Sequence, residues 1–383
     1  EGHEHPLEAE DGGYHAGWVA GAGHGARYRF RLDDGGPLPD PASRCQPEGP
    51  LGASMVVDPH RYAWGDQGWR GLGRDDQVLY ELHVGTFTPE GTWRAAAAKL
   101  AHLAALGVTA VEMMPVNTFP GRFGWGYDGV SLFAPYPPYG EPDDLRFFVD
   151  EAHRQGVGVI LDVVYNHLGP GGDFIERFAP SYFSERYVTD WGRALNFDGA
   201  NSGPVREWII ANGRYWTQEF HVDGFRIDAT QNIYDFDRGH EHVLAEFARE
   251  ARAAAGERTI LVIGENEPQE TYLIRPPEAG GLGLDMLWND DFHHSAIVAL
   301  AGRNEAYLTD YRGAAQEFVS TARRGFLYQG QRYRWQDMPR GTTIKGLAPA
   351  QLVSFLQNHD QIANMGRGLR AHQLAGPARL RTL

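Results

Sequence analysis

Residues 222–229, which read VDGFRIDA, predict a short strand that carries an arginine inward and ends on a carboxylate. Side chains alternate along a strand, so Arg226 and Asp228 lie on the same face, two residues apart. Burying a carboxylate at the end of an apolar strand costs several kcal/mol unless it is paired, and Arg226 supplies a partner. Taken alone, the stretch fits a structural ion pair and a catalytic carboxylate equally well.

On either side of this strand, apolar runs alternate with amphipathic helical segments. We expect a parallel sheet covered on both faces, because strands and helices that alternate in this way form βαβ units. No glycine-rich nucleotide fingerprint follows any strand, so we favour a closed (β/α)8 TIM barrel over an open doubly wound sheet. The chain ends in a helix-like stretch from about residue 369, so we expect the barrel to lack its last strand in this chain. The other expected strands are 78–84, 109–114, 157–165, 259–264, 284–288 and 352–356, and the expected helices are 93–106, 143–155, 204–220, 242–255 and 313–324.

The first part of the chain has a different texture. Residues 1–72 contain short apolar and aromatic runs broken by Gly, Pro and Asp clusters, which is typical of short antiparallel strands joined by tight turns. We therefore predict a partial N-terminal β-sandwich over residues 1–72. Residues 73–383 would form the catalytic barrel, with a long loop insertion around residues 168–203.

Composition narrows the class of partner. The net charge of −15 and the lack of any Lys/Arg-rich run argue against binding to nucleic acid or to an anionic membrane. No apolar run is long enough to span a bilayer, and no signal-peptide pattern opens the chain, so we expect a cytoplasmic protein. Cys45 is the single cysteine, which excludes an internal disulfide and a thiolate metal cluster. We expect a neutral or weakly charged substrate, no cofactor and no metal ion.

Polar side chains occur where four of the expected strands end. Because catalytic groups of a barrel sit at the C-terminal ends of its strands, these side chains should meet at one rim. They lie in the segments DVVYNH (162–167), RID (226–228), GEN (264–266) and QNHD (357–360). Several carboxylates with imidazoles, an arginine and no cysteine indicate glycoside chemistry, which needs one carboxylate to attack or to activate water and a second that is held protonated.

The different surroundings of Asp228 and Glu265 in the sequence indicate which is the nucleophile and which is the acid/base. Asp228, beside Arg226, is expected to stay ionised and to act as the nucleophile. Glu265 follows an apolar strand and has no cationic neighbour in sequence, so we assign it as the acid/base. Glu267, on the same strand face, is the alternative for that role.

The four segments resemble, in order and spacing, the four motif regions of the alpha-amylase superfamily of glycoside hydrolases. The resemblance implies a retaining double displacement in which Asp228 forms a covalent glycosyl intermediate. It also implies that Asp360 binds sugar hydroxyls and distorts the ring. By the same resemblance, the other side chains expected to contact the sugar are His167, His359, Tyr127, Arg226, Asp162 and Asn166, with Tyr127 as a stacking platform.

Three further segments are similar to those of maltooligosyltrehalose trehalohydrolases within that superfamily, namely residues 80–93, 119–145 and 288–313. The resemblance implies hydrolysis of the α-1,4 bond beside the terminal trehalose of maltooligosyltrehalose or a related α-glucan. Recognition of that end would come from a polar and aromatic set, because buried polar groups left unpaired by ordinary maltodextrin discriminate strongly. The set we assign is Trp288, Asp290, Asp291 and His293, with Trp125 and Tyr127.

Three alternatives remain open at this level. Asp290 and Asp291 could instead cap the helix that follows them. The protein could be a 1,4-α-glucan branching enzyme, which transfers the glycosyl group to a sugar hydroxyl instead of to water. Less favoured is a carbohydrate-binding barrel without catalysis.

Overall fold

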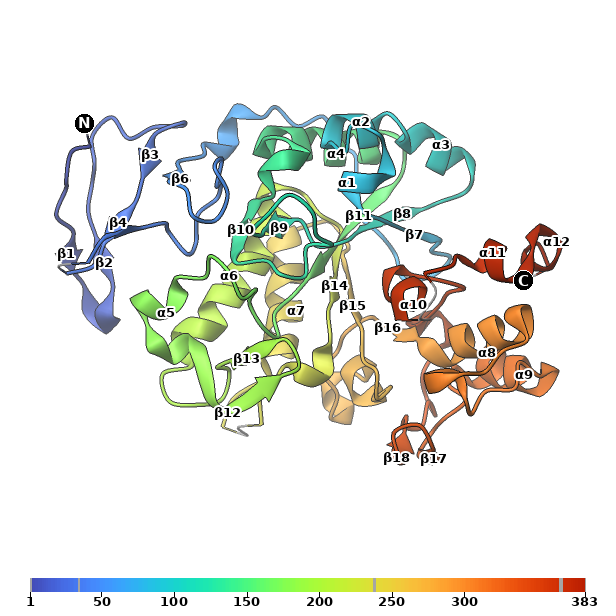
Figure 1. Cartoon of the computed structure of the whole chain (residues 1–383). Helices are drawn as coiled ribbons and strands as arrows, with labels where there is room; N and C mark the ends of the chain where they lie inside the picture. Colours follow the sequence, from blue (N-terminus) through green and yellow to red (C-terminus); the bar gives the residue numbers. More distant parts are fainter. Residues whose placement is uncertain (1, 34, 237–238, 365–367, 383) are drawn as a thin grey trace.

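A curled parallel sheet of seven strands organises the computed structural model, which describes residues 2–33, 35–236, 239–364 and 368–382 (Figure 1). Each strand of this sheet pairs with the member of the sheet that follows it in sequence. Within the described residues, β7 and β19 form the two edges of the sheet. This order confirms the predicted (β/α)8-barrel class. The strands are β7 (Leu79–Leu82), β8 (Ala110–Met113), β11 (Gly158–Val163), β14 (Gly224–Ile227), β15 (Leu261–Gly264), β16 (Met286–Asn289) and β19 (Leu352–Ser354).

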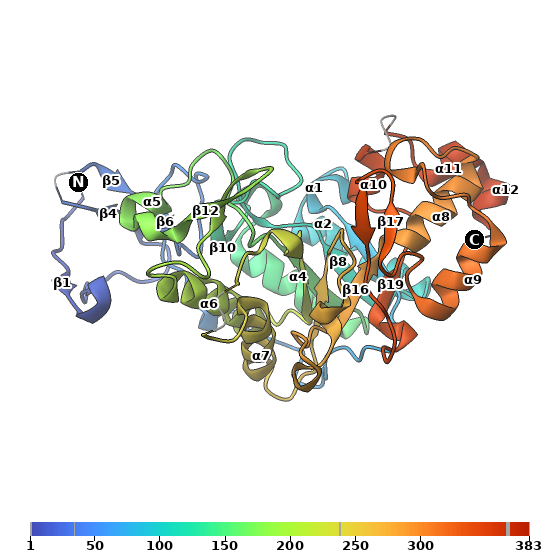
Figure 2. The same cartoon turned by 90° about the horizontal axis from the view of Figure 1, so that it is seen from below.

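Helices cover the outer face of the sheet and form a second group beside β16 and β19 (Figures 1 and 2). The N-terminal segments lie at one end of the molecule, and this second group, α8 to α12, lies at the other. The longer helices and those of the second group are α4 (Pro142–Arg154), α6 (Gly203–Glu219), α7 (Val243–Ala255), α8 (Asp290–Ala301), α9 (Ala315–Arg324), α10 (His359–Asn364), α11 (Ala371–Ala375) and α12 (Pro377–Leu380). Among the described residues, no helix combines the length and the apolar character needed to cross a membrane.

The structure differs from the sequence analysis at two places along the helices. The expected helix 93–106 is two short helices, α2 (Trp93–Ala97) and α3 (Leu100–Ala105), because an alanine-rich run favours helix throughout and gives no sign of an interruption. Helix α8 was expected to follow Asp290 and Asp291, but its bounds were not predicted. Most of its side chains are buried, so it lacks the polar face by which an amphipathic helix is recognised.

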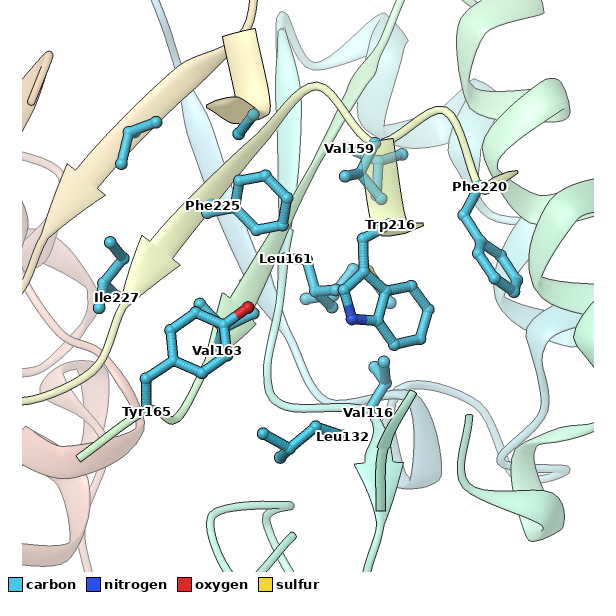
Figure 3. Packing of buried hydrophobic residues seen from close by; sticks show 14 of the residues in the cluster. Val116, Leu132, Val159, Leu161, Val163, Tyr165, Trp216, Phe220, Phe225 and Ile227 are labelled. Carbon is cyan, nitrogen blue, oxygen red and sulfur yellow. The ribbon is translucent and has the colours of Figure 1, made fainter. Parts of the chain in front are cut away.

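The core lies between the sheet and the helices that cover it (Figure 3). Trp216 of α6 belongs to one cluster of buried side chains with Leu161 of β11 and Phe225 of β14. Burial of each such side chain stabilises the fold by about 1.5–3 kcal/mol. The core therefore fixes β11 and β14 side by side, and the register pairs Asp162 with Arg226.

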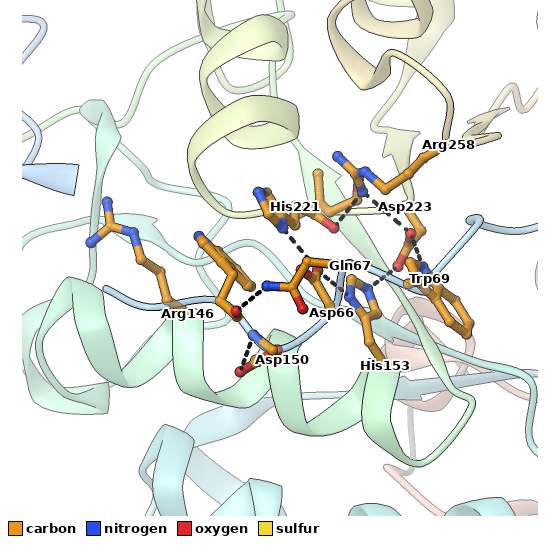
Figure 4. Close-up of polar contacts among 12 residues, drawn as sticks. Asp66, Gln67, Trp69, Arg146, Asp150, His153, His221, Asp223 and Arg258 are labelled. Atoms are coloured by element: carbon orange, nitrogen blue, oxygen red, sulfur yellow. Dashed lines mark hydrogen bonds and ion pairs between the residues drawn. The ribbon is translucent and has the colours of Figure 1, made fainter. Parts of the chain in front are cut away.

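A polar network joins the N-terminal ends of the strands to the chain that precedes the barrel (Figure 4). His153 of α4 lies between two carboxylates, with Nδ1 2.9 Å from Asp66 Oδ2 and Nε2 2.7 Å from Asp223 Oδ2. Asp223, just before β14, also accepts hydrogen bonds from the Trp69 indole at 2.7 Å and from the Val159 backbone at 2.9 Å. These hydrogen bonds hold the segment around residues 66–69 against the base of the barrel, which is the side where the N-terminal ends of the strands lie.

The N-terminal region contains three antiparallel pairs of two-residue strands. They are β1 (Glu8–Ala9) with β2 (His15–Ala16), β3 (Arg27–Tyr28) with β6 (Ser54–Met55), and β4 (Phe30–Arg31) with β5 (Pro37–Leu38). The sandwich over residues 1–72 and the boundary at residue 72 stay predictions. Residues 168–203 carry α5 (Ile175–Phe178) and a hairpin of β12 (Phe183–Thr189) and β13 (Gly192–Leu195).

Candidate active site

Arg226 on β14 is the centre of the site at the C-terminal ends of the strands. Its side chain is fully buried, and Nη1 lies 2.9 Å from both carboxylate oxygens of Asp162 and 2.9 Å from Asp228 Oδ1. The guanidinium also lies over the Trp288 ring, 4.2 Å from its centroid, where a desolvated cation is attracted by the aromatic face. The arginine therefore holds two carboxylates from neighbouring strands in fixed orientations.

Asp228 is held from two sides. Besides Arg226, the Asn166 amide donates a hydrogen bond of 2.9 Å to Asp228 Oδ2. Its side chain keeps an exposed fraction of 13 %, so the carboxylate is accessible while both oxygens have donors. Hydrogen bonds to the charged form favour that form, which suits an ionised nucleophile.

Glu265, directly after β15, has different surroundings. Its Oε2 accepts a hydrogen bond of 2.6 Å from the Ala229 backbone amide. Ala229 has a φ of 40°, in the left-handed region that non-glycine residues rarely adopt, and this turn aims its N–H at Glu265. Burial raises the pKa of Glu265 to about 8, and the charges of Asp228 and Asp360 add to the rise.

The expectation that Glu265 has no cationic neighbour holds in sequence only. Arg226 Nη2 lies 3.5 Å from Glu265 Oε2, so one guanidinium contacts both Asp228 and Glu265. The pKa of Glu265 is nevertheless raised, because desolvation and like charges outweigh the arginine. The two side chains are exposed to a similar degree, 17 % for Glu265 and 13 % for Asp228, so their hydrogen-bond partners distinguish them. Asp228 accepts from Arg226 and Asn166, whereas Glu265 accepts from one backbone amide.

Glu267, the alternative acid/base, forms an ion pair with the buried Arg340. Arg340 also lies 3.5 Å from Asp290 Oδ2. A carboxylate that is paired with an arginine is stabilised in its ionised form. These contacts favour Glu265 over Glu267 as the proton donor.

Aromatic side chains surround His359 at the start of α10. Tyr127 stacks on its ring with centroids 4.9 Å apart, and Trp125 meets it edge-on at 5.4 Å. The Tyr127 hydroxyl donates a hydrogen bond of 2.6 Å to Asp162 Oδ2. The long loop after β8 thus brings Tyr127 and Trp125 to the same rim as the strand ends.

Asp360 lies next to a cavity of about 240 Å3 at this rim. His359 Nε2 is 3.5 Å from Asp360 Oδ1. The cavity brings together Glu265 and Asp360, which were predicted at two different strand ends. Polar and aromatic side chains, most of them from the part of the chain that runs from α8 to α10, complete the lining. Its lining residues are Glu265, Glu267, Trp288, Asp290, His294, Tyr307, Trp335, Gln336, Arg340, Asn358, Asp360, Gln361 and Asn364.

His167 lies on the other side of Asn166 from the nucleophile. It is buried, its Nδ1 hydrogen-bonds to the Asn166 side-chain oxygen, and its ring stacks on Trp191 with centroids 5.7 Å apart. Burial lowers the pKa of His167, so its imidazole is neutral at neutral pH. Trp191, on the hairpin connection between β12 and β13, had no distinguishing signal in the sequence.

The residues assigned to trehalose recognition divide into three groups. Trp288 and Asp290 line the cavity, and burial raises the pKa of Asp290 to about 7. Trp125 and Tyr127 lie beside His359. Asp291 and His293 are fully buried and are not among the lining residues, which disfavours the prediction that they contact substrate.

Asp291 has no oxygen left for a ligand. Its Oδ1 accepts from Gln269 and Tyr311, and its Oδ2 accepts from the backbone amides of Leu327 and Tyr328. His293 stacks on Phe355, and its Nδ1 contacts the Leu356 carbonyl. The capping alternative was also wrong, because the side chain that caps α8 is that of Asn289, which accepts from the Phe292 amide.

Three functional candidates were missed from the sequence. Glu81 lies in the middle of β7 and contacts His359, and Arg340 and Trp335 reach the cavity from the strand pair β17 (Gln331–Tyr333) and β18 (Met338–Arg340) and its connection. The one usable signal was the carboxylate of Glu81 inside an expected strand. Among the described residues, no group of three or more His, Cys, Asp or Glu side chains is placed to hold a metal ion.

The chain is similar to known proteins of one superfamily. The alpha-amylase catalytic-domain family matches residues 57–193. A malto-oligosyltrehalose trehalohydrolase of Deinococcus radiodurans is 44% identical over 377 residues, which cover 98% of this chain and 60% of that protein. The chain belongs to the alpha-amylase superfamily.

Two further members of the alpha-amylase superfamily give the range of the similarity. A Salmonella typhimurium protein described as an alpha-amylase has a solved structure with a TM-score of 0.92 and 41% identity, covering 98% of this chain and 64% of that one. A 1,4-alpha-glucan branching enzyme of Corynebacterium jeikeium is 31% identical, over 97% of this chain and 60% of that protein. The chain thus spans about three fifths of the length of these relatives.

Proposed function

We propose that this chain carries the catalytic site of a retaining α-glucan hydrolase that releases trehalose from maltooligosyltrehalose. The observation that carries the chemistry is the pair Asp228 and Glu265. Arg226 and Asn166 hold the first as a carboxylate, while burial raises the pKa of the second to about 8. One ionised and one protonated carboxyl group at the same rim are what glycoside hydrolysis by double displacement requires.

In the first step, Asp228 Oδ attacks the anomeric carbon while Glu265 gives its proton to the leaving glycosidic oxygen. The bond between sugar and leaving oxygen breaks as the bond between sugar and Asp228 forms. In the second step, Glu265 takes a proton from water, the hydroxide oxygen attacks the same carbon, and the Asp228 carboxylate leaves. Asp360, which lines the cavity beside Glu265, and His359, whose Nε2 lies 3.5 Å from Asp360, would bind the sugar hydroxyls.

The substrate assignment is supported by two observations. The Deinococcus radiodurans relative, at 44% identity, is named a malto-oligosyltrehalose trehalohydrolase. The cavity next to Glu265 offers Trp288 as an apolar surface and Asp290 as a hydrogen-bonding group, which suits a disaccharide end. Neither nucleic acid nor a membrane enters this proposal, in keeping with the net charge of −15.

Product analysis tests the proposal. The protein is incubated with maltooligosyltrehalose and, in parallel, with a maltooligosaccharide of the same length and with amylose. We expect trehalose from the first substrate and little cleavage of the other two. New α-1,6 branches in amylose would replace the proposal with the branching reaction, which the Corynebacterium jeikeium relative is named for. Binding of these glucans without any product would indicate a carbohydrate-binding barrel.

A further inference from the structure

Glu81 connects the first strand of the sheet to the last polar segment of the site. It lies in β7, and its Oε2 accepts a hydrogen bond of 2.9 Å from the His359 backbone amide. Its Oε1 lies 2.6 Å from His359 Nδ1. A single carboxylate thus contacts both the backbone and the ring of a residue 278 positions away in sequence, so it fixes the ring orientation as well as the position of the α10 N-terminus.

The opposite ring nitrogen of His359 lies beside Asp360, which lines the cavity. Its Nε2 lies 3.5 Å from Asp360 Oδ1, and Trp288, which lines the catalytic cavity, is 6.4 Å away between ring centroids. With Glu81 accepting from Nδ1–H, a neutral imidazole would present an unprotonated Nε2 to Asp360 and to the sugar. Only the imidazolium can donate from both nitrogens at once.

The charged groups around His359 favour that imidazolium. Glu81 approaches from β7, Asp360 from α10 and Asp162 through the Tyr127 hydroxyl, while Arg226 on β14 opposes them. Burial alone would lower the pKa of His359, but the hydrogen bond and charge of Glu81, with the charge of Asp360, outweigh it and raise the pKa.

Glu112 is a second glutamate beside Glu81. The two glutamates are register partners on the adjacent strands β7 and β8. Burial, and then the charge of Glu81, raises the pKa of Glu112 well above its ordinary range, so Glu112 is neutral. The negative charge that acts on the imidazole is that of Glu81.

We infer that Glu81 is a positioning residue for the hydrolysis, which holds His359 as an imidazolium with its Nε2–H aimed at Asp360 and at a sugar hydroxyl in the cavity. This inference rests on the proposed function only in naming the sugar as the acceptor. The stabilisation of the His359 imidazolium by Glu81 is a property of the free protein and does not require the sugar.

The test measures the pKa of His359 by NMR on protein with isotope-labelled histidine, with the signal assigned by its loss in His359→Gln. In the unsubstituted protein we expect a pKa above the ordinary value of about 6.5. Glu81→Gln, which keeps the shape and removes the charge, should lower the pKa of His359 by at least about one unit, since an opposite charge at this distance shifts a pKa by roughly 1–3 units. Glu112→Gln is the matched control and should leave the pKa of His359 nearly unchanged, because it replaces a neutral group by a neutral one.

Activity supplies the second readout. At neutral pH, Glu81→Gln should lower kcat/KM for the α-glucan by roughly 10- to 100-fold, the loss of one charge-assisted hydrogen bond. Part of this loss should be recovered on acidification, because more His359 is then protonated, and Glu81→Gln should cause little further loss in a His359→Gln background. A loss that is independent of pH would instead indicate a merely structural role and overturn the inference.

The outcomes separate this inference from the proposed function. A pKa of His359 at or below about 6.5 in the unsubstituted protein overturns the inference even if Glu81→Gln does not fold. Release of trehalose with a pKa of His359 that Glu81→Gln does not change would sustain the proposed function and overturn the role of Glu81. If no trehalose is released but Glu81→Gln shifts the pKa of His359 as expected, the role of Glu81 is sustained and the proposed function is overturned.

Discussion

The buried imidazole of His153 offers the sharpest test of how the barrel base is held together (Figure 4). It contacts Asp66 at 2.9 Å and Asp223 at 2.7 Å, and its side chain and both carboxylates are almost fully buried. His153→Ala removes two charge-assisted hydrogen bonds, each worth about 1.5–3 kcal/mol. It also takes one cationic partner from each of two buried carboxylates, although Asp66 keeps His221 and Asp223 keeps Arg258.

We therefore expect His153→Ala to lower the free energy of unfolding by about 3–5 kcal/mol, measured by urea denaturation at neutral pH. The stacking of His153 on Trp69, with ring centroids 4.7 Å apart, is lost as well and lies within this range. His102→Ala, at an exposed position of α3, is the matched control and should change the free energy of unfolding by no more than about 0.5 kcal/mol.

The same network predicts how stability depends on pH. Burial alone would lower the pKa of His153, but its hydrogen bonds to Asp223 and Asp66 outweigh burial and raise the pKa. The folded state therefore binds more protons than the unfolded state between the unfolded value of about 6.5 and the higher folded-state pKa. The stabilisation is complete below about pH 6.5 and is lost as pH rises through the folded-state pKa.

The difference in stability between the unsubstituted protein and His153→Ala, measured between about pH 5 and 9, isolates this contribution, because groups such as Glu265 and Asp290 titrate in both proteins. Hydrogen bonds from His153 and His221 lower the pKa of Asp66, whose own contribution is lost only in strong acid. The difference should decline as pH rises through the folded-state pKa of His153. A loss below about 1 kcal/mol, together with a pH dependence like that of the unsubstituted protein, would refute the reasoning that His153 is a charged link between the two carboxylates.

Two predictions concern catalysis. Asp228→Asn should abolish turnover while oligosaccharide binding, measured by calorimetry, is retained, since the amide preserves the shape but cannot attack; appreciable activity would remove Asp228 as the nucleophile. Because Glu265 must be protonated to serve the leaving group, kcat/KM should fall as pH rises through its pKa of about 8. Asp290→Asn removes one of the like charges that raise this pKa, so it should move this alkaline limb of the pH profile to lower pH. An alkaline limb that stays in place after Asp290→Asn would contradict the electrostatic coupling of the two groups.

The strand ends were predictable from local sequence because each functional residue follows an apolar run in a repeating βα pattern. In a parallel barrel, the C-terminal ends of the strands must share one rim. That geometric rule is why Asp228, Glu265 and Asp360 could be placed together without any knowledge of their distances.

Local sequence could not distinguish Asp290 from its neighbour Asp291. Both follow β16, yet Asp290 lines the cavity, whereas Asp291 is enclosed by groups from the chain beyond α8. Whether a carboxylate is free or fully bonded depends on segments that are distant in sequence, and only packing decides that. The same holds for Glu81, whose partner His359 belongs to the other end of the sheet.

The sequence by itself determined the barrel class and predicted the rim that carries the chemistry and the nucleophile, because strand period and the Arg226–Asp228 spacing are local properties. The tertiary structure decided the protonation states and the surroundings of the site. Glu265 is near Arg226 in space and has a raised pKa even so, because its burial and the charges gathered from other strand ends outweigh the arginine. Desolvation and electrostatic coupling are sums over the whole fold, and no stretch of sequence contains them.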